Sequence, residues 1–486
     1  MRRLLVLLAL PVLLAACASS SGETTAGSAS APASGAKATS SGHDWTRFGY
    51  DAQRSNHAPR SLLRSVSGLK RRKVRLPGTV DSSPIYLHSV SVKGKRRDVF
   101  FVTTTYGRTL AIEARSGKRL WQFVPKGIKG WQGSAQFTTA TPVADPGRRF
   151  IYASSPNGLI HKLSVASGHE ASGRWPVRIT KDATHEKIAS ALNVSGRFVL
   201  AVTGGYIGDA PPYQGHVVSI SRASGRLGGV FNTLCADRHQ IIQPSSCQSS
   251  DSAIWARAGA IVLPRSKRIL VTTGNAPYNG KTDFGDTVLL LSPRARSVLQ
   301  TYTPSEQKQL EDTDGDLGSS APALLPESKP RVGVQGGKDG KLRVISLSRL
   351  NGRNGTPGAA LGGELQTLPQ PGGSLFSTPA VAGSRMFLAT AGGTVAYDLQ
   401  GSHLGVAWRN GHSGTSPVIV GGRLLVFDPS GGGLRIYRPS DGKLLRTLPA
   451  GRGHWNSPAV GDGRIALGEG DSNDQKTSGV LDIYAR

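Results

Sequence analysis

The chain has 486 residues, among them 62 glycines and 29 prolines, and a formal net charge of +28 at pH 7. This composition, without a long amphipathic helical run, argues against a helical protein and favours one large strand-and-turn body. So basic a chain requires a nucleic-acid partner to be considered, but the basic clusters at residues 70–73 and 93–97 contain no aromatic residue. We therefore expect no nucleic acid, and instead solvated basic faces attracted to anionic envelope polymers.

Residues 1–16 have the pattern of a secretory signal. Arg2 and Arg3 precede an apolar run at residues 4–14, and two alanines precede Cys17. The run is too short to cross a ~30 Å hydrocarbon core, so it predicts a cleaved leader. Residues 14–17 (LAAC) resemble a bacterial lipobox, which implies that Cys17 becomes a lipid-modified N-terminus. An ordinary signal peptide with an incidental cysteine is the alternative.

Composition divides the rest of the chain into two parts. Residues 18–42 are almost wholly Ser, Ala, Gly and Thr, which predicts a disordered tether. From Asp44 onward, apolar and β-branched runs alternate with glycine-rich turns up to the C-terminus. The expected organisation is a leader at 1–16, a lipidated cysteine and tether at 17–43, and a folded body at 44–486. We expect export, with the lipid anchored in the outer face of the cell membrane or in the outer membrane.

A short signature of a small residue, a proline and an aliphatic residue recurs along the body. Its copies are Ser83-Pro84-Ile85, Thr141-Pro142-Val143, Ala321-Pro322-Ala323, Thr378-Pro379-Ala380, Ser416-Pro417-Val418 and Ser457-Pro458-Ala459. Two copies without proline, at residues 190–192 and 252–254, occupy the intervals where the spacing would double. Each copy begins a unit of about 40 to 60 residues with several short apolar strands.

Such units bury their faces only by stacking, either in an open solenoid or in a closed ring. A ring is favoured because closure removes exposed sheet edges. The sequence therefore predicts an all-β fold, an eight-bladed β-propeller of four-stranded antiparallel blades. The strand at residues 480–484 is expected to close the ring by completing the sheet begun near Trp45. We expect the propeller to be monomeric.

Cys235 and Cys247 remain once Cys17 is assigned to lipidation. An even pair of cysteines in an exported chain predicts a local disulfide, worth roughly 3 kcal/mol for a loop of this size. Two free thiols or a metal site are the alternatives, although no clustered histidines accompany the pair.

Residues 45–51 (WTRFGYD) and the unit at residues 107–121 (GRTLAIEARSGKRLW) resemble the repeats of the pyrroloquinoline quinone (PQQ) dehydrogenase propellers. The resemblance extends over residues 44–486. In that family, PQQ stacks on an aromatic ring at the propeller axis, calcium polarises the quinone, and an aspartate acts as the base.

The resemblance implies four site residues. Trp255 is similar to the stacking tryptophan, and Asn275 to the calcium ligand that follows a glycine. Asp316 resembles the catalytic base, and Lys338 resembles the basic residue that contacts the quinone carbonyl. A core tryptophan and ordinary turns at Asn275 and Lys338 are the open alternatives.

The chain also departs from the family. It has no adjacent cysteine pair, and the glutamate calcium ligand has no match, Asp209 being only nearby. It has no Cys-x-x-Cys-His haem motif, so electrons from a quinol would need a separate acceptor. The resemblance thus leaves PQQ and calcium as open cofactors of an incomplete site.

The sequence leaves three functions open. The first is a binding or scaffold propeller at the cell envelope, similar to lipoproteins with this repeat that assist outer-membrane protein assembly. The second is a PQQ- and calcium-dependent alcohol or sugar dehydrogenase. The third is a degenerate propeller that binds another planar ligand or a glycan. The dehydrogenase requires Trp255, Asn275, Asp316 and Lys338 to converge on the axial funnel.

Overall fold

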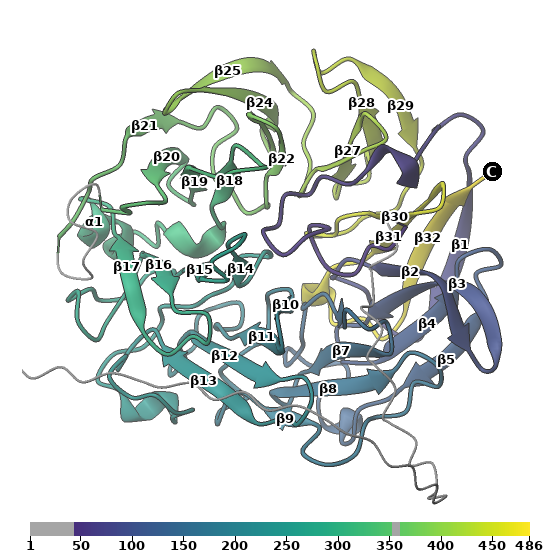
Figure 1. Ribbon diagram of the computed structural model, residues 1–486, viewed down its shortest axis with the longest axis horizontal. Coiled ribbons are helices and arrows are strands. Elements are labelled where there is room, and N and C mark those ends of the chain that lie inside the picture. The colour runs from purple at the N-terminus through teal and green to yellow at the C-terminus, as the bar shows by residue number, and fades with distance from the viewer. Residues whose placement is uncertain (1–42, 352–359) are drawn as a thin grey trace, which may run out of the picture. The chain divides into compact units, whose positions relative to one another are not determined.

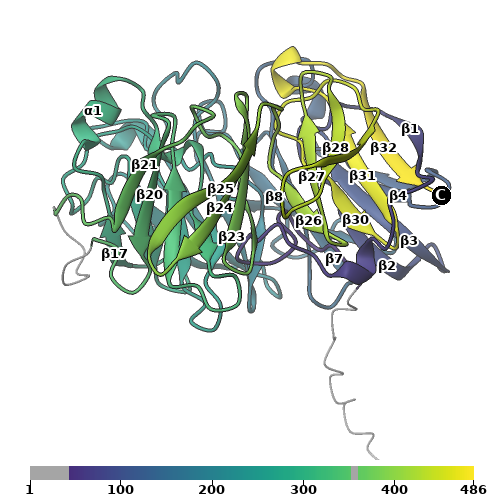
Figure 2. The ribbon, with the colours of Figure 1, turned by 90° about the horizontal axis from the view of Figure 1, so that it is seen from above.

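The computed structural model describes residues 43–351 and 360–486, which form eight four-stranded antiparallel sheets arranged as blades around one axis (Figure 1). Seen from above, the strands of the blades run through the thickness of the ring (Figure 2). The predicted all-β, eight-bladed propeller is confirmed. The predicted leader, the lipidation site at Cys17 and the tether up to residue 42 lie outside the described residues.

In every blade the strands follow one another outward from the axis. Blades 1 and 2 are β2 (Ile85–Val92), β3 (Lys95–Thr103), β4 (Thr109–Glu113), β5 (Arg119–Phe123), then β6 (Val143–Ala144), β7 (Phe150–Ser155), β8 (Leu159–Ser164) and β9 (Val177–Arg178). Blades 3 and 4 are β10 (Asn193–Ser195), β11 (Phe198–Val202), β12 (His216–Ser221), β13 (Leu227–Asn232), then β14 (Ile261–Val262), β15 (Ile269–Thr272), β16 (Val288–Leu291) and β17 (Val298–Tyr302).

The second half of the ring repeats this order. Blades 5 and 6 are β18 (Ala323–Leu325), β19 (Val332–Gly336), β20 (Lys341–Ser346), β21 (Gln366–Pro369), then β22 (Ala380–Ala382), β23 (Arg385–Thr390), β24 (Gly393–Gln400) and β25 (His403–Asn410). Blades 7 and 8 are β26 (Val418–Val420), β27 (Arg423–Asp428), β28 (Gly433–Tyr437), β29 (Leu444–Leu448), then β30 (Ala459–Gly461), β31 (Arg464–Glu469), β32 (Gly479–Ala485) and β1 (Lys70–Leu76).

Helical structure in the described residues is short. It comprises α1 (Gln307–Asp312) and the 3-10 helices η1 (Arg60–Leu62), η2 (Ile128–Gly130), η3 (Pro244–Ser246), η4 (Leu317–Ser319) and η5 (Ser472–Asp474). Over residues 43–351 and 360–486, no helix has the length and apolar character needed to cross a membrane.

The repeated signature marks where each innermost strand begins. In all copies that contain proline, the aliphatic residue is the first residue of that strand: Ile85, Val143, Ala323, Ala380, Val418 and Ala459. Proline has no N–H to donate, so it fits immediately before strand pairing begins. The copy at residues 252–254 differs, because β14 begins only at Ile261. The extra residues carry Trp255 to the axis.

Blade 8 closes the ring. Its outermost strand β1 pairs with the C-terminal strand β32 over the full register from Lys70↔Ala485 to Leu76↔Gly479. The predicted closure by both ends of the chain is confirmed, but the N-terminal partner is β1 and not the segment near Trp45. Trp45 instead forms a bridge with Tyr86 of blade 1. Buried side chains such as Phe100, Leu425 and Ile483 pack blades 1, 7 and 8 into one core.

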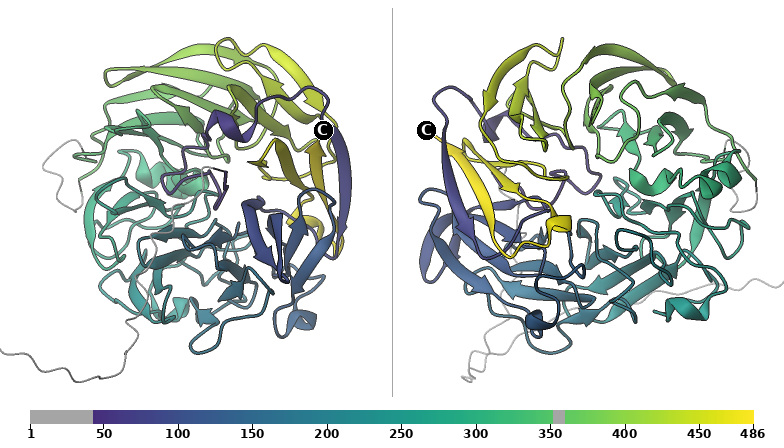
Figure 3. Two further views of the ribbon diagram at one scale, coloured as in Figure 1. Left: turned by 45° about the vertical axis from the view of Figure 1, so that its right-hand side comes forward. Right: turned by 180° about the vertical axis from the view of Figure 1, so that it is seen from behind.

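The segment at residues 44–63, which we name the plug segment, lies across one end of the ring (Figure 3). Its main-chain atoms bond to the innermost strands of several blades: Trp45–Tyr86, Thr46–Ala144, Ala52–Val262, Ser55–Val381 and Asn56–Ile419. The Arg54 side chain is 2% exposed and donates to the carbonyl oxygens of Phe48, Ala191, Leu192 and Ala258. The plug segment therefore satisfies backbone groups at the centre of the ring that otherwise have no strand partner.

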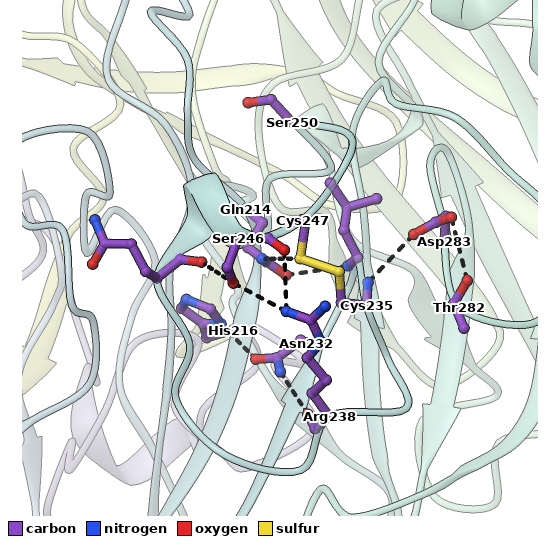
Figure 4. Close-up of a disulfide and its surroundings, with 12 residues drawn as sticks. Gln214, His216, Asn232, Cys235, Arg238, Ser246, Cys247, Ser250, Thr282 and Asp283 are labelled. Carbon is purple, nitrogen blue, oxygen red and sulfur yellow. Dashed lines mark hydrogen bonds between the residues drawn. A yellow bond between two sulfur atoms is a disulfide. The ribbon is translucent and has the colours of Figure 1, made fainter.

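A disulfide joins Cys235 to Cys247, as predicted (Figure 4). The loop that it closes follows β13 and leads to the turn before Trp255. Gln214 Nε2 donates to Cys247 Sγ at 3.4 Å, and Cys235 N donates to Asp283 Oδ1 at 3.3 Å. The disulfide thus secures a long excursion between blades 3 and 4.

Candidate ligand site on the propeller axis

A cavity of ≈ 230 Å³ lies on the axis at the end opposite the plug segment. We name it the axial cavity. The direction of the chain through blade 2 shows which end it occupies: Thr139, which precedes β6, lines the cavity, whereas Ala144, the last residue of β6, bonds to Thr46. The plug segment therefore closes one end of the ring, and ligand access is from the other.

The structure brings the four residues implied by the family resemblance together in the axial cavity. Asp316 Oδ1 accepts a hydrogen bond from the Asn275 backbone N–H at 2.7 Å, and Asp316 Oδ2 lies 2.6 Å from Lys338 Nζ. Lys338 Nζ also lies 5.6 Å from the ring centroid of Trp255. The convergence that a dehydrogenase requires is present, while the chemical role of each residue remains a prediction.

Gly274 allows this close packing. A Cβ at this position would lie 2.2 Å from Asp316 Oδ1, so only glycine admits the carboxylate against the backbone. Asp316 itself precedes η4 and is 4% exposed. Gly274 therefore leaves room for the Asp316 carboxylate, and the backbone N–H of Asn275 donates a hydrogen bond to it.

The charges of Asp316 and Lys338 depend on each other. Burial raises the pKa of Asp316, and Lys338 offsets only part of this effect. Burial opposes the charge of Lys338, but Asp316 and Asp314 outweigh it and raise the pKa of the amine. Lys338 Nζ also lies 2.7 Å from Asp314 Oδ1. Lys338 is therefore an ammonium shared between two carboxylates.

Aromatic side chains cluster beside the axial cavity. Trp255, Phe376 and Trp455, all half-buried, have ring centroids 5.8 to 6.0 Å apart. His454 stacks on Trp455 with centroids 3.9 Å apart. Trp255 and Trp455 line the axial cavity, and their rings suit a flat ligand, because aromatic rings prefer stacked or offset contacts.

A buried ion pair supports the cavity. Arg257 lines the cavity, is 5% exposed, and its Nη2 donates to Asp81 Oδ1 at 2.5 Å. Asp81 Oδ2 accepts from His454 Nδ1 at 2.8 Å and from Ser472 Oγ at 2.6 Å. Burial would raise the pKa of Asp81, but Arg257 and His454 outweigh burial and hold it well below its usual range. Asp81 thus holds Arg257 in place. It also holds His454, whose ring stacks on Trp455.

The donors present do not fit the calcium ion that the family resemblance implies. Calcium takes six to eight oxygen ligands. Both oxygens of Asp316 are already engaged by Asn275 and Lys338, and the ammonium stands where a cation would bind. Asp209 Oδ1 accepts from the Tyr213 hydroxyl at 3.0 Å. The groups of histidine and acidic side chains close enough to share an ion, within the described ranges, do not include Asp316.

Sequence reasoning missed several cavity residues, namely Lys187, Tyr206, Arg257, His454 and Trp455. A signal for one of them, Trp455, was present in the repeat. The third residue before the signature proline is Thr139 in blade 2, Phe376 in blade 6 and Trp455 in blade 8. Equivalent positions of a ring point to the same axis, so this offset marks axial residues. Lys187 has no such mark in the sequence.

A second hollow of ≈ 710 Å³ is lined by residues of blades 4, 5 and 6. It is lined by turns that carry the exposed basic residues Arg265, Arg268, Lys329 and Arg331. Among its described lining residues there is no carboxylate. Its charge matches the anionic envelope polymer that the sequence suggests as a partner, and this partner remains a prediction.

The architecture is that of an eight-bladed β-propeller similar to the PQQ dehydrogenase fold. No protein-family model and no curated protein matches the sequence. Among solved structures, the chain is similar to the quinohemoprotein alcohol dehydrogenase of Comamonas testosteroni, with 15% identity over 91% of this chain and 80% of that one, and a TM-score of 0.62. A europium-containing methanol dehydrogenase is similar at 13% identity over 92% and 98% of the two chains, with a TM-score of 0.64.

A protein without a dehydrogenase name has the same architecture. BamB from Moraxella catarrhalis is 13% identical over 86% of this chain and 100% of that one, with a TM-score of 0.53. At these identities the likeness is one of fold, and a fold of this kind hosts more than one function. The function must therefore be argued from the axial cavity.

Proposed function

We propose that the protein is an exported, lipid-anchored binding protein of the cell envelope, whose axial cavity holds a small planar anion. One observation carries the proposal: the rings of Trp255 and Trp455 border a cavity that is also lined by Lys187, Arg257 and Lys338. Flat rings bury a planar ligand, and the cations match its charge. The envelope placement rests on the leader and lipobox-like residues.

Charge and size narrow the ligand. The cavity is lined by three basic side chains and two carboxylates, those of Asp209 and Asp316. Its volume of ≈ 230 Å³ is below the ~300–1,000 Å³ of most ligand pockets. Both features favour a small planar anion, and the tricyclic PQQ is the largest ligand that we expect the cavity to hold.

Binding without redox catalysis is the better-supported function, because the donors around Asp316 do not fit calcium. The ion pair with Lys338 also engages the carboxylate that the dehydrogenase mechanism would need as a free base. A binding propeller needs neither group free. A scaffold function, in which the outer surface binds an envelope protein, is compatible with a filled axial cavity.

Titration with PQQ tests the proposal. The mature chain from residue 17, carrying Cys17→Ser, is titrated with and without calcium while tryptophan fluorescence is followed. We expect saturable quenching that does not depend on calcium. Trp255→Ala removes a stacking contact of roughly 1–3 kcal/mol, so affinity should fall by about 5- to 150-fold.

Trp408→Phe is the matched control, since Trp408 lies on the outermost strand β25 and should leave the affinity unchanged. Absence of quenching, or equal affinity in the Trp255→Ala variant, would refute a planar-ligand site. Quenching that requires calcium, together with alcohol-dependent dye reduction, would instead establish the dehydrogenase.

The anchor is tested in the full-length chain. Wild-type protein is expected in the membrane fraction, and Cys17→Ser in the soluble exported fraction, because only the cysteine sulfur can carry the lipid. Ser19→Ala is the control and should stay with the membrane. Recovery of wild type and Cys17→Ser in the same fraction would contradict lipidation at Cys17.

A further inference from the structure

Two primary amines line the axial cavity, and their surroundings differ. Lys338 Nζ lies within ion-pair distance of Asp314 and Asp316. Lys187 Nζ has neither an ion pair nor a hydrogen bond to any residue in the described ranges, and lies 4.2 Å from the ring centroid of Phe137. One amine is therefore held as a shared ammonium, whereas the other is free to react with what enters the cavity.

The backbone fixes where Lys187 stands. Its N–H donates to the Gly204 carbonyl at 2.6 Å, and the Gly204 N–H donates back to the Lys187 carbonyl at 2.9 Å. This bridge ties the entry to blade 3 to the end of β11. The Lys187 side chain is part-buried, and it lines the cavity together with Trp255 and Arg257.

The charged groups that face Lys187 leave its amine largely uncompensated. Burial, the largest effect, and nearby Arg257 together lower the pKa of Lys187 to about 7, against the opposing effects of Asp81 and Asp471. Asp81 is bound by Arg257, His454 and Ser472 and forms no ion pair with Lys187. The Phe137 ring favours the ammonium, but a ring face replaces only part of the lost hydration. A large share of the amine is therefore neutral, and nucleophilic, near neutral pH.

We propose that Lys187 is a covalent capture site, whose amine condenses with the aldehyde or ketone group of a small anionic ligand in the axial cavity. The nitrogen attacks the carbonyl carbon to form a carbinolamine. The C–O bond then breaks, and the oxygen leaves as water with the two protons of the amine, which leaves a C=N imine. No electrons are transferred, and hydrolysis reverses the step. The inference rests on the proposed function for the use of this cavity, and adds the carbonyl to the ligand class.

Reductive trapping tests this site. Pyridoxal 5′-phosphate is a suitable probe because it combines a planar ring, an anionic group and an aldehyde. The mature Cys17→Ser chain is incubated with the probe from pH 6 to pH 10, reduced with borohydride, and mapped by peptide mass spectrometry. We expect Lys187 to be labelled at least about tenfold faster at pH 7.5 than the exposed Lys126, with a midpoint near pH 7.

Two variants complete the experiment. Lys187→Met keeps the length of the side chain without an amine and should lose the labelled cavity peptide at an unchanged melting temperature, whereas Lys338→Arg should retain labelling of Lys187. Labelling of Lys187 no faster than of Lys126, or with a midpoint above pH 9, would overturn the inference. Saturable PQQ quenching without trapping at Lys187 would leave the planar-anion site in place and reject only the covalent step. Trapping at Lys187 without PQQ quenching would support the covalent step and reject the planar-anion site.

Discussion

The Asp81→Ala variant is expected to lose about 3–5 kcal/mol of unfolding free energy, because it leaves the charge of Arg257 buried without its partner. Asp81 is 1% exposed, and both of its carboxylate oxygens are engaged. The ion pair also links two distant blades, since Asp81 lies just before the first strand of blade 1 and Arg257 just before that of blade 4. Urea denaturation at pH 7, followed by tryptophan fluorescence, measures the loss.

Asp312→Ala is the control, because Asp312 is exposed, and this variant should leave the denaturation midpoint unchanged. Asp81→Asn adds a test by pH. The folded-state pKa of Asp81 lies below its unfolded value near 3.9, so its charge stabilises the fold fully above that value and less as pH falls below about 4. The stability difference between wild type and Asp81→Asn should therefore shrink from pH 7 to pH 3. A difference that stays constant would show that Asp81 stabilises the protein without its charge.

The Arg54→Ala variant is expected to lose roughly 2–4 kcal/mol, since several buried carbonyl groups lose a donor at once. Arg54 bonds to carbonyls of its own segment and of the entries to blades 3 and 4. Burial lowers the pKa of its guanidinium to about 9. Arg54 thus couples the plug segment to the ring, and its loss should expose that segment to protease as well as lower the melting temperature.

Arg64→Ala is the matched control, because Arg64 follows the same segment but is exposed. Its stability should stay within about 0.5 kcal/mol of wild type. An equal melting temperature for wild type and Arg54→Ala would mean that the ring holds without these bonds. Cleavage of the plug segment at an unchanged melting temperature would show that the segment is not part of the cooperative fold.

These two variants also separate the ends of the propeller. Arg54→Ala acts at the closed end and should leave PQQ affinity unchanged in the population that stays folded. Asp81→Ala acts beneath Arg257 and His454, which line the axial cavity, so it should weaken binding as well as stability. The comparison tests whether the axial cavity depends on the buried ion pair.

Local patterns determined much of this protein. The small-residue, proline, aliphatic signature begins the innermost strands, so its count predicted eight blades. Cys235 and Cys247 were paired correctly because they are the two cysteines that remain when Cys17 is assigned to lipidation. The family resemblance pointed to Trp255, Asn275, Asp316 and Lys338, and the closed ring brings all four into the axial cavity, while their chemical roles stay predictions.

Only the tertiary structure decided which distant residues meet. Asp81 and Arg257 are 176 positions apart, and the ring places both at its centre. It also decided that β1, rather than the Trp45 segment, closes blade 8, because β1 has the length to pair with all of β32. The pairing of Lys338 and the isolation of Lys187 have the same origin: a repeat sets where a side chain points, but its charged neighbours come from other blades.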